Sequence, residues 1–468
     1  MKDATPPSRG RTWQAGTLVY STAGVVALFA WLVLGDFAWW TRDRSVNPMA
    51  QWYLAHLQVP NLLFAVLINS VPAVIQLIIC PIISVRSDRH RSRWGRRIPF
   101  IAATTAIATL GMIGLGLTPF LSDSLFRLFG AAPENRKLIA IVCFSVFWIL
   151  FEVAALASKP VFDGLINDVV PRPLLGRFFG LFRAVGLIDG MIFNYWIMGL
   201  VPTHFAVIMV TAGMIYGTAF LWVCFKVKEG AYPPAPPPPA ARRMTGIVGS
   251  VREYCRECFS HPYYLSVFTL IMMAGLCFMP FNAFTIPYAQ HVGLDMDRFG
   301  KAQALVYLIS LALAYLLGWM ADRFHPLRMA IGVLAGFIVL TIWATFSVRT
   351  PETFMIAFIL HGVVSGSYYT AAASSLQQQL FPREKFAQFV SAAMIFDAIA
   401  RMFSLPLVGL IIDRAGSAYH YTFTVAFILA LFALAAALHV YRQFKKLGGP
   451  ENYQAPDPKR APARASAP

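Results

Sequence analysis

Several ionisable residues interrupt the apolar runs of this chain, where a charge is costly. They are Asp36, Glu152, Arg177, Arg183, Asp189, Asp397 and Arg401. A charged side chain at the centre of a bilayer costs about 3 kcal/mol on insertion scales, so each of these residues is a functional candidate. A carboxylate accepts hydrogen bonds from neighbouring hydroxyl groups, and an arginine donates a rigid fork to others. Carboxylates and arginines of this kind are therefore suited to bind a polyhydroxylated solute, with structural ion pairing as the alternative.

Some of these carboxyl groups could instead carry a proton. A carboxyl group binds and releases a proton near neutral pH when desolvation raises its pKa and a neighbouring arginine tunes it. Glu152, Asp189 and Asp397 are the candidates for coupling to a cation. Asp397 stands four residues before Arg401, so the alternative for this residue is mutual neutralisation on one helix face.

Aromatic and small polar residues supply further candidates. Aromatic rings pack on the apolar face of a sugar, and Trp39 lies close to Asp36 in sequence, although a packing or membrane-interface role is the alternative. The stretch "HGVVSGSYYTAAASSLQQQ", residues 361–379, is rich in small and hydrogen-bonding side chains. These residues either permit close helix packing or line a cavity in which His361 and Tyr368 contact a substrate.

The stretch "SVRSDRHRSRWGRRIPF", residues 84–100, concentrates positive charge around one aspartate. One interpretation is a solvated signal that fixes membrane orientation. The other is a latch that forms in one conformation and is released in another, because a partly buried ion pair is worth little more than thermal energy. An Asp-Arg pair at the corresponding place in the second half of the chain favours the latch. Its candidate residues are Asp88, Arg89, Arg93, Arg96, Arg97, Asp322 and Arg323.

The surrounding sequence predicts an all-α polytopic membrane protein. The chain has 468 residues, of which 57% are hydrophobic and 13% charged, and its apolar runs are long enough to cross a bilayer of roughly 30 Å. We expect twelve membrane-spanning helices, at 17–41, 59–84, 98–120, 138–160, 178–201, 203–226, 262–289, 302–321, 327–348, 353–380, 386–412 and 418–441.

The distribution of basic residues predicts the orientation. With both termini in the cytoplasm, the cytoplasmic segments, counted with the cytoplasmic ends of the adjoining spans, hold 28 of the 39 Lys and Arg residues, as expected for a protein of the inner membrane. This bias accounts for the net charge of +17 without a nucleic-acid partner. The cysteines and histidines have no metal-ligand spacing, so we expect no metal or other cofactor, and we expect a monomer.

The chain divides into two six-helix halves. Residues 1–228 and 261–446 form the predicted bundles, residues 229–260 a cytoplasmic linker, and residues 447–468 a disordered tail. The linker holds "YPPAPPPPAARR" and then an amphipathic helix. "SDRHRSR" follows the second span and "GWMADRFHPLR" the eighth, while "VVPRPLLGRF" follows the fourth and "LFPREKFAQF" the tenth. Two pseudo-symmetric bundles of this kind are typical of major facilitator transporters.

The arginine-rich loop resembles that of the glycoside–pentoside–hexuronide cation symporters, the melibiose permease family, and equally that of the related sucrose:proton transporters. The resemblance rests on Ser87-Asp88-Arg89 and on "RWGRRIPF", residues 93–100. "GDFA" at Asp36 resembles the permease family's sugar-binding aspartate. Glu152 and Arg177 are separated by the 25 residues that part the family's acidic sugar ligand from its arginine. The resemblance thus implies a sugar site at these three residues.

The chain departs from the family where sodium is bound. The two aspartates that sodium-coupled members carry in the second helix are replaced here by Gln76 and Cys80. Sodium coupling by that route is therefore not expected, and a proton is the preferred coupling ion.

We therefore expect a secondary transporter that takes up a small saccharide, of the glucoside or disaccharide type, by alternating access. Efflux or uptake of a non-sugar amphipathic solute and uncoupled facilitation are the alternatives. An enzyme would need clustered metal ligands or a nucleophile with its base, and a sensor a soluble output domain. The sequence indicates neither.

Overall fold

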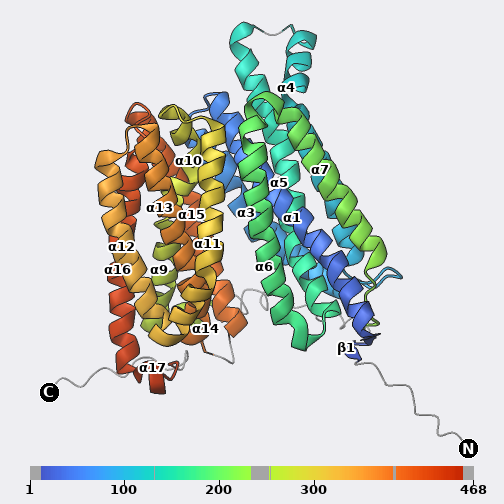
Figure 1. Cartoon of the computed structure of the whole chain (residues 1–468), viewed down its shortest axis with the longest axis vertical. Helices are drawn as coiled ribbons and strands as arrows, with labels where there is room; N and C mark the ends of the chain where they lie inside the picture. The colour runs from blue at the N-terminus through green and yellow to red at the C-terminus, as the bar shows by residue number, and fades with distance from the viewer. Residues whose placement is uncertain (1–11, 131, 233–251, 253, 383–385, 457–468) are drawn as a thin grey trace, which may run out of the picture. The chain divides into compact units, whose positions relative to one another are not determined.

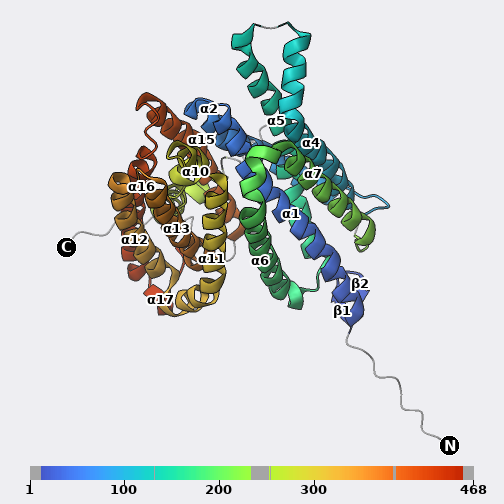
Figure 2. The same cartoon turned by 45° about the horizontal axis from the view of Figure 1, so that its top comes forward.

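The computed structural model describes residues 12–130, 132–232, 252, 254–382 and 386–456. Long helices make up most of these ranges, as Figures 1 and 2 show. Strand β1 (Trp13–Ala15) pairs with β2 (Leu18–Tyr20) in a short antiparallel hairpin that precedes the first helix.

Contacts divide the chain into two compact units. The first falls within Met1–Ala50 and Ile75–Pro236, and the second within Gln51–Val74 and Pro237–Pro468. Residues 51–74 thus belong to the second unit, although the chain on both sides of them belongs to the first.

The first unit consists of long helices with short 3-10 or π-helical turns. Its elements are α1 (Thr22–His56, whose end lies in the second unit), α3 (Val71–Arg89), α4 (Ile98–Leu128), η2 (Pro133–Asn135), α5 (Arg136–Val169), η3 (Arg172–Leu174), α6 (Leu175–Ile192), η4 (Phe193–Ile197), η5 (Met198–Leu200) and α7 (Val201–Lys226). Helices α4 and α5 run side by side as a long pair (Figure 1), and α7 packs against α4.

The second unit is built in the same way. Its elements are α2 (Asn61–Ala65), η1 (Val66–Ser70), α9 (Pro262–Leu276), α10 (Met279–His291), α11 (Met296–Phe324), α12 (Pro326–Ser347), α13 (Pro351–Tyr368), η6 (Tyr369–Ala373), α14 (Ser374–Leu380), α15 (Phe386–Arg414), α16 (Tyr421–Lys446) and α17 (Gly449–Asn452). Helix α16 buries Ala426, Ala430, Ala433 and Ala437 on one face. These small side chains let α9 and α12 approach it closely.

Ten stretches of the described residues are long and apolar enough to span a membrane. One of them, Phe178–Lys226, has 49 residues. It is interrupted by η4 and η5 and leaves the helical conformation at His204, so it contains two of the predicted spans, 178–201 and 203–226. The predicted span 302–321 lies in α11, which is not among the ten.

A group of hydrogen bonds holds residues 51–74 within the second unit. The Asp413 carboxylate near the end of α15 accepts from the backbone N–H groups of Asn61 and Leu62 at 2.9 Å and from the Asn61 side chain at 2.8 Å. The Tyr419 hydroxyl donates to Asn61 Oδ1 at 2.9 Å. A Cβ at Gly409 would collide with the Asn61 carbonyl oxygen, so only glycine permits this approach. Asp413 therefore caps the helix that starts at Asn61.

Replacement of Asp413 by alanine is expected to lower the free energy of unfolding by about 1–2 kcal/mol, because three donors lose their acceptor. Thermal unfolding of the purified protein, followed by tryptophan fluorescence, measures this change. The control is Asp297→Ala, which removes an exposed pair with Lys301 one turn away and should cost less than about 0.5 kcal/mol. Equal effects of the two substitutions would contradict the capping role.

The linker and tail pack partly against the second unit. Residues 254–259 are helical, and Cys258 is fully buried in the core of that unit. In the tail, the Tyr453 hydroxyl donates to the Leu380 carbonyl at 2.8 Å, and the Tyr264 hydroxyl donates to the Pro456 carbonyl at 2.6 Å. The disorder expected from residue 447 therefore does not apply to residues 447–456. Residues 233–251 and 457–468 lie outside the described ranges.

Candidate functional site

The arginine-rich loop joins α3 to α4 and is held by a carboxylate from a distant segment. Glu229 accepts hydrogen bonds from the backbone N–H groups of Arg96, Arg97 and Ile98 at 2.8–3.0 Å. These are orphan donors at the start of α4, where the helix dipole favours a negative charge. Gly95 takes a φ of +102°, which favours glycine, and a Cβ there would collide with Glu229. The fit between loop and carboxylate is close.

Asp168, near the end of α5, is the centre of the ion pairs. Arg96 donates to both of its oxygens at 2.8 Å, and Arg97 Nε donates to Oδ2 at 2.6 Å. The Tyr232 hydroxyl adds a hydrogen bond at 3.1 Å, and Arg97 also reaches Asp88 at 2.9 Å. Burial alone would lower the pKa of Arg96, but the hydrogen bond and charge of Asp168 outweigh it, so this pKa is raised.

The structure brings together only part of the predicted latch. Asp88, Arg96 and Arg97 form ion pairs, whereas Arg89 and Arg93 are exposed. The sequence did not identify Asp168 and Glu229 as partners of the arginines, because both lie outside the loop. The only signal in the sequence was that each follows a predicted span.

The corresponding place in the second half has no such loop. Helix α11 ends at Phe324 and α12 begins at Pro326, with His325 alone between them. Arg323 is exposed and stacks over Trp319 at 5.6 Å. The side chain of Asp322 lies outside the described part of the chain.

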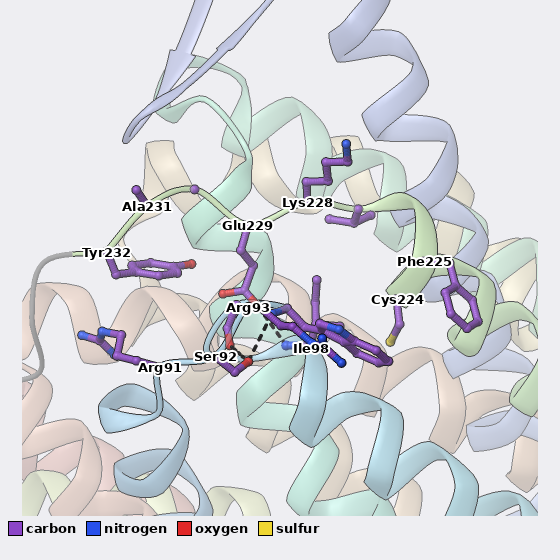
Figure 3. A pocket seen from close by; sticks show the side chains of 14 residues that line it. Arg91, Ser92, Arg93, Ile98, Cys224, Phe225, Lys228, Glu229, Ala231 and Tyr232 are labelled. Atoms are coloured by element: carbon purple, nitrogen blue, oxygen red, sulfur yellow. Dashed lines mark hydrogen bonds between the residues drawn. The ribbon is translucent and has the colours of Figure 1, made fainter.

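Residues 227–232, here called the strap, cross this face of the first unit. Figure 3 shows Glu229 reaching from the strap toward the loop, with Tyr232 and Arg91 at one end and Phe225 and Cys224 at the other. The strap and the loop enclose an open cavity of about 660 Å³. The Glu229 carboxylate inside this cavity already accepts hydrogen bonds from the backbone at the start of α4. We therefore treat the cavity as part of the same cluster of ion pairs and hydrogen bonds.

A second polar cluster lies deep in the first unit. Asp36 on α1, Glu152 on α5 and Asp189 on α6 are 6%, 6% and 4% exposed. Asp189 accepts a hydrogen bond from the Thr41 hydroxyl at 2.9 Å, while Oδ2 of Asp36 and Oδ2 of Asp189 are buried without a hydrogen-bond partner among the described residues. Helix α1 continues through Pro48 to His56, so Asp36 lies in the interior of a long helix and not near its end. Three carboxyl groups are thus buried on three helices.

Two cations that the sequence does not single out act on two of these carboxyl groups. Arg42 is 5% exposed, lies 4.0 Å over the Trp39 ring and 3.8 Å from the Asp43 carboxylate, and its charge acts on Glu152. The charge of Lys159 acts on Asp36; this side chain lies 5.5 Å from the Trp39 ring, is 48% exposed and forms an ion pair with Asp163. Arg42 was overlooked because the predicted span ended at residue 41. Trp39 is buried and contacts both cations, in agreement with a packing role.

The remaining predicted site residues are not all in this cluster. Arg177 lies in the first turn of α6, but its side chain is outside the described part of the chain. His361 and Tyr368 belong to the second unit and are 1% and 2% exposed. His361 contacts Asn282 Oδ1 at 3.0 Å inside an aromatic core.

A cavity of about 210 Å³ lies wholly within the second unit. Helices α9, α10, α13, α14 and α15 and the π-helical turn η6 surround it. Its polar lining residues are Tyr368, Tyr369, Gln377, Asp397 and Arg401. Asp397 and Arg401 form an ion pair at 2.7 Å, so the neutralisation considered from the sequence is present.

Comparison with known proteins identifies the fold. Residues 266–465, less than half of the chain, match the family model of the Major Facilitator Superfamily. The whole chain is similar to a bacterial homologue of the human lysosomal transporter Spinster, with 13% identity, a TM-score of 0.67, and coverage of 93% of this chain and 100% of that one. It is similar to a D-xylose–proton symporter, with 14% identity, a TM-score of 0.62, and coverage of 94% and 100%.

A third solved structure is the nucleoside transporter NupG, with 11% identity, a TM-score of 0.60, and coverage of 89% of this chain and 99% of that one. These likenesses confirm the expected fold class, an all-α polytopic membrane protein of the major facilitator fold. At these identities the likenesses show the fold alone, and the family match extends over residues 266–465 only. They do not distinguish the melibiose permease family or the sucrose transporters within the superfamily.

Proposed function

We propose that this protein takes up a small saccharide by alternating access, with a proton as the coupling ion. The observation that carries the proposal is the burial of Asp36, Glu152 and Asp189 on three helices of the first unit, next to the cations Arg42 and Lys159. Carboxylates and cations side by side offer the acceptors and donors that sugar hydroxyls require. We place the protein in the inner membrane as a monomer, with both termini in the cytoplasm.

In this proposal the carboxyl groups have different roles. Asp36 and Glu152 bind the sugar, together with Arg177, and Glu152 and Asp189 carry the proton. Asp397 contributes less to coupling because Arg401 already neutralises it. The ion pairs of Arg96 and Arg97 with Asp168, and of Arg97 with Asp88, act as the cytoplasmic latch, which forms in one state of the cycle and is broken in another.

Counterflow in proteoliposomes tests the substrate class. Vesicles loaded with one saccharide at a time should accumulate labelled saccharide from outside, and sugar addition to cells expressing the protein should drive proton uptake. Exchange without proton movement would support an uncoupled facilitator. Failure of every saccharide to exchange, in protein shown to be folded, would refute the proposal.

A nucleoside or an amphipathic solute is the second candidate. One of the similar solved structures is a nucleoside transporter and another is a symporter of D-xylose, so the shared fold is compatible with either solute. Adding nucleosides to the counterflow panel distinguishes a nucleoside from a saccharide as the transported solute.

A further inference from the structure

Helices α1 and α6 lie side by side in the first unit, as Figures 1 and 2 show, and they meet closely next to Asp189. A Cβ at Gly186 of α6 would collide with the indole ring of Trp40 on α1, at 2.6 Å. Asp189 follows Gly186 by three residues and so lies on the same face of α6. Thr41, the residue after Trp40, is its neighbour across the contact. The packing of Trp40 on glycine therefore sets the distance between Thr41 and Asp189.

The Thr41 hydroxyl has two oxygen neighbours but only one hydrogen. Its Oγ1 lies 2.9 Å from the Phe37 carbonyl oxygen and 2.9 Å from Oδ1 of Asp189. A carbonyl oxygen only accepts, and so does an ionised carboxylate, whereas a protonated carboxyl group also donates. Both contacts are therefore full hydrogen bonds at the same time only when Asp189 is protonated and donates to Thr41, while Thr41 donates to Phe37.

The ionised form of Asp189 requires the opposite direction. The hydroxyl hydrogen of Thr41 then points to the carboxylate, and the Phe37 carbonyl keeps the backbone N–H that it accepts within the helix. Threonine forms such a bond to the carbonyl four residues before it readily and gives it up at little cost. The Thr41 hydroxyl is thus placed to serve Asp189 in both protonation states.

The surroundings of Asp189 make this hydroxyl important. The side chain is 4% exposed, and its Oδ2 has no hydrogen-bond partner among the described residues. The charges of Arg44 and Asp36, both on α1, also act on it. On α6 itself, Arg183 is six residues away and exposed. Because a buried carboxylate is costly without donors, the loss of the Thr41 hydroxyl would penalise the ionised form.

We propose that Thr41 is the hydroxyl partner that lets Asp189 gain and release the coupling proton. Thr41 donates to the carboxylate when Asp189 is ionised and accepts from the carboxyl group when Asp189 is protonated. Only the direction of its hydrogen changes, so Oδ1 is paired in both states. The proton stays on Asp189 and none passes to Thr41, which is a positioning residue. The inference rests on the proposed function, in which Asp189 carries the proton.

Replacement of Thr41 by valine removes the hydroxyl and keeps the shape. Release of the proton from Asp189 should be hindered, so sugar-driven proton uptake should fall about tenfold or more. Counterflow exchanges sugar without net proton movement and should stay within about twofold of the wild-type rate. Thr41→Ser keeps the hydroxyl and should restore proton uptake. Thr41→Ala, which also lacks the hydroxyl, replaces Thr41→Val if the valine variant does not fold.

The matched control is Thr218→Val on α7 of the same unit. Thr218 donates to the carbonyl of Met214, four residues before it, at 2.7 Å, as Thr41 does to Phe37. It is exposed and meets no carboxylate among the described residues. Proton uptake and counterflow should both be unchanged in this variant.

Infrared spectroscopy of the purified protein tests the contact without transport. The carboxyl C=O band that disappears in Asp189→Asn belongs to Asp189, and its amplitude is followed against pH. In Thr41→Val the midpoint of this titration should move to higher pH by about one unit or more, because the ionised form has lost its donor. In Thr41→Ser it should stay within about 0.3 unit of the wild-type midpoint. Arg44 and Asp36 are present in every variant, so the difference reports the hydroxyl.

The outcomes separate this inference from the proposed function. If the wild-type protein exchanges no saccharide, the proposed function fails, and a shifted midpoint in Thr41→Val still supports the role of Thr41 in the titration of Asp189. If wild-type uptake is coupled but Thr41→Val takes up protons normally, this inference alone fails, whatever the midpoint. Equal losses in Thr41→Ser and Thr41→Val would show that shape and not the hydroxyl matters, and would also overturn it.

Discussion

Replacement of Glu152 by glutamine is expected to raise the half-saturating saccharide concentration roughly 10- to 100-fold. This increase corresponds to the loss of one charge-assisted hydrogen bond to the sugar. Proton movement on sugar addition should also be lost, because an amide side chain is neither protonated nor deprotonated near neutral pH. Glutamine has the same shape, and Arg42 keeps the Asp43 carboxylate at 3.8 Å, so the fold should be retained. Counterflow and proton uptake, together with thermal unfolding, measure these effects.

The matched control is Glu134→Gln, at an exposed position in η2 of the same unit. It should leave transport and stability unchanged. Full transport by Glu152→Gln would contradict the role of this residue and would favour the amphipathic solute, since an apolar substrate makes no use of a buried carboxylate. A large loss of thermal stability in Glu152→Gln would indicate a structural role instead.

Replacement of Asp168 by asparagine is expected to have the largest effect on stability. Two arginines that are 11% and 18% exposed would lose their shared carboxylate. Removing one partner of a buried pair costs 3–5 kcal/mol, and partial exposure here reduces the expected loss to about 2–4 kcal/mol. The loop before α4 should also become accessible to trypsin at Arg96 or Arg97. Thermal unfolding and limited proteolysis of inside-out vesicles measure the two effects.

Asp123→Asn is the control for this substitution. Asp123 pairs with Arg136 at 2.8 Å, but their side chains are 45% and 64% exposed, so the loss should be within about 1 kcal/mol. If Asp168→Asn unfolds at the wild-type temperature and resists trypsin equally, Asp168 does not hold the loop. Glu229→Gln then separates the contribution of the strap, since the amide still offers one acceptor oxygen to the start of α4.

The fold class could be predicted from the sequence because a bilayer imposes a simple rule. Every backbone polar group within it must be paired locally, so long apolar runs can only be helices. The same rule marked Asp36, Glu152 and Asp189 as unusual, and all three are buried in the first unit. Helix boundaries were predicted less accurately, and α1 extends beyond the predicted end at residue 41. Charged residues such as Arg42 can continue a helix when the surrounding protein offers aromatic faces and carboxylates.

Partners far apart in sequence could not be predicted in this way. Asp168 and Glu229 hold the arginine-rich loop from distances of about 70 and 130 residues along the chain. Asp413 caps the helix starting at Asn61, from more than 350 residues away. No local pattern specifies such pairings, because a carboxylate after one span looks the same whether it faces water or a helix N-terminus.

The sequence by itself determined the membrane-spanning helices and the few charged groups set among them, since the hydrophobic effect and backbone pairing act on each segment alone. Only the tertiary structure decided which charges meet. It buried His361 in an aromatic core and brought Asp168 to the arginine-rich loop. The physical reason is that ion pairing and burial depend on how the helices pack against one another. The composition of a single helix does not determine that packing.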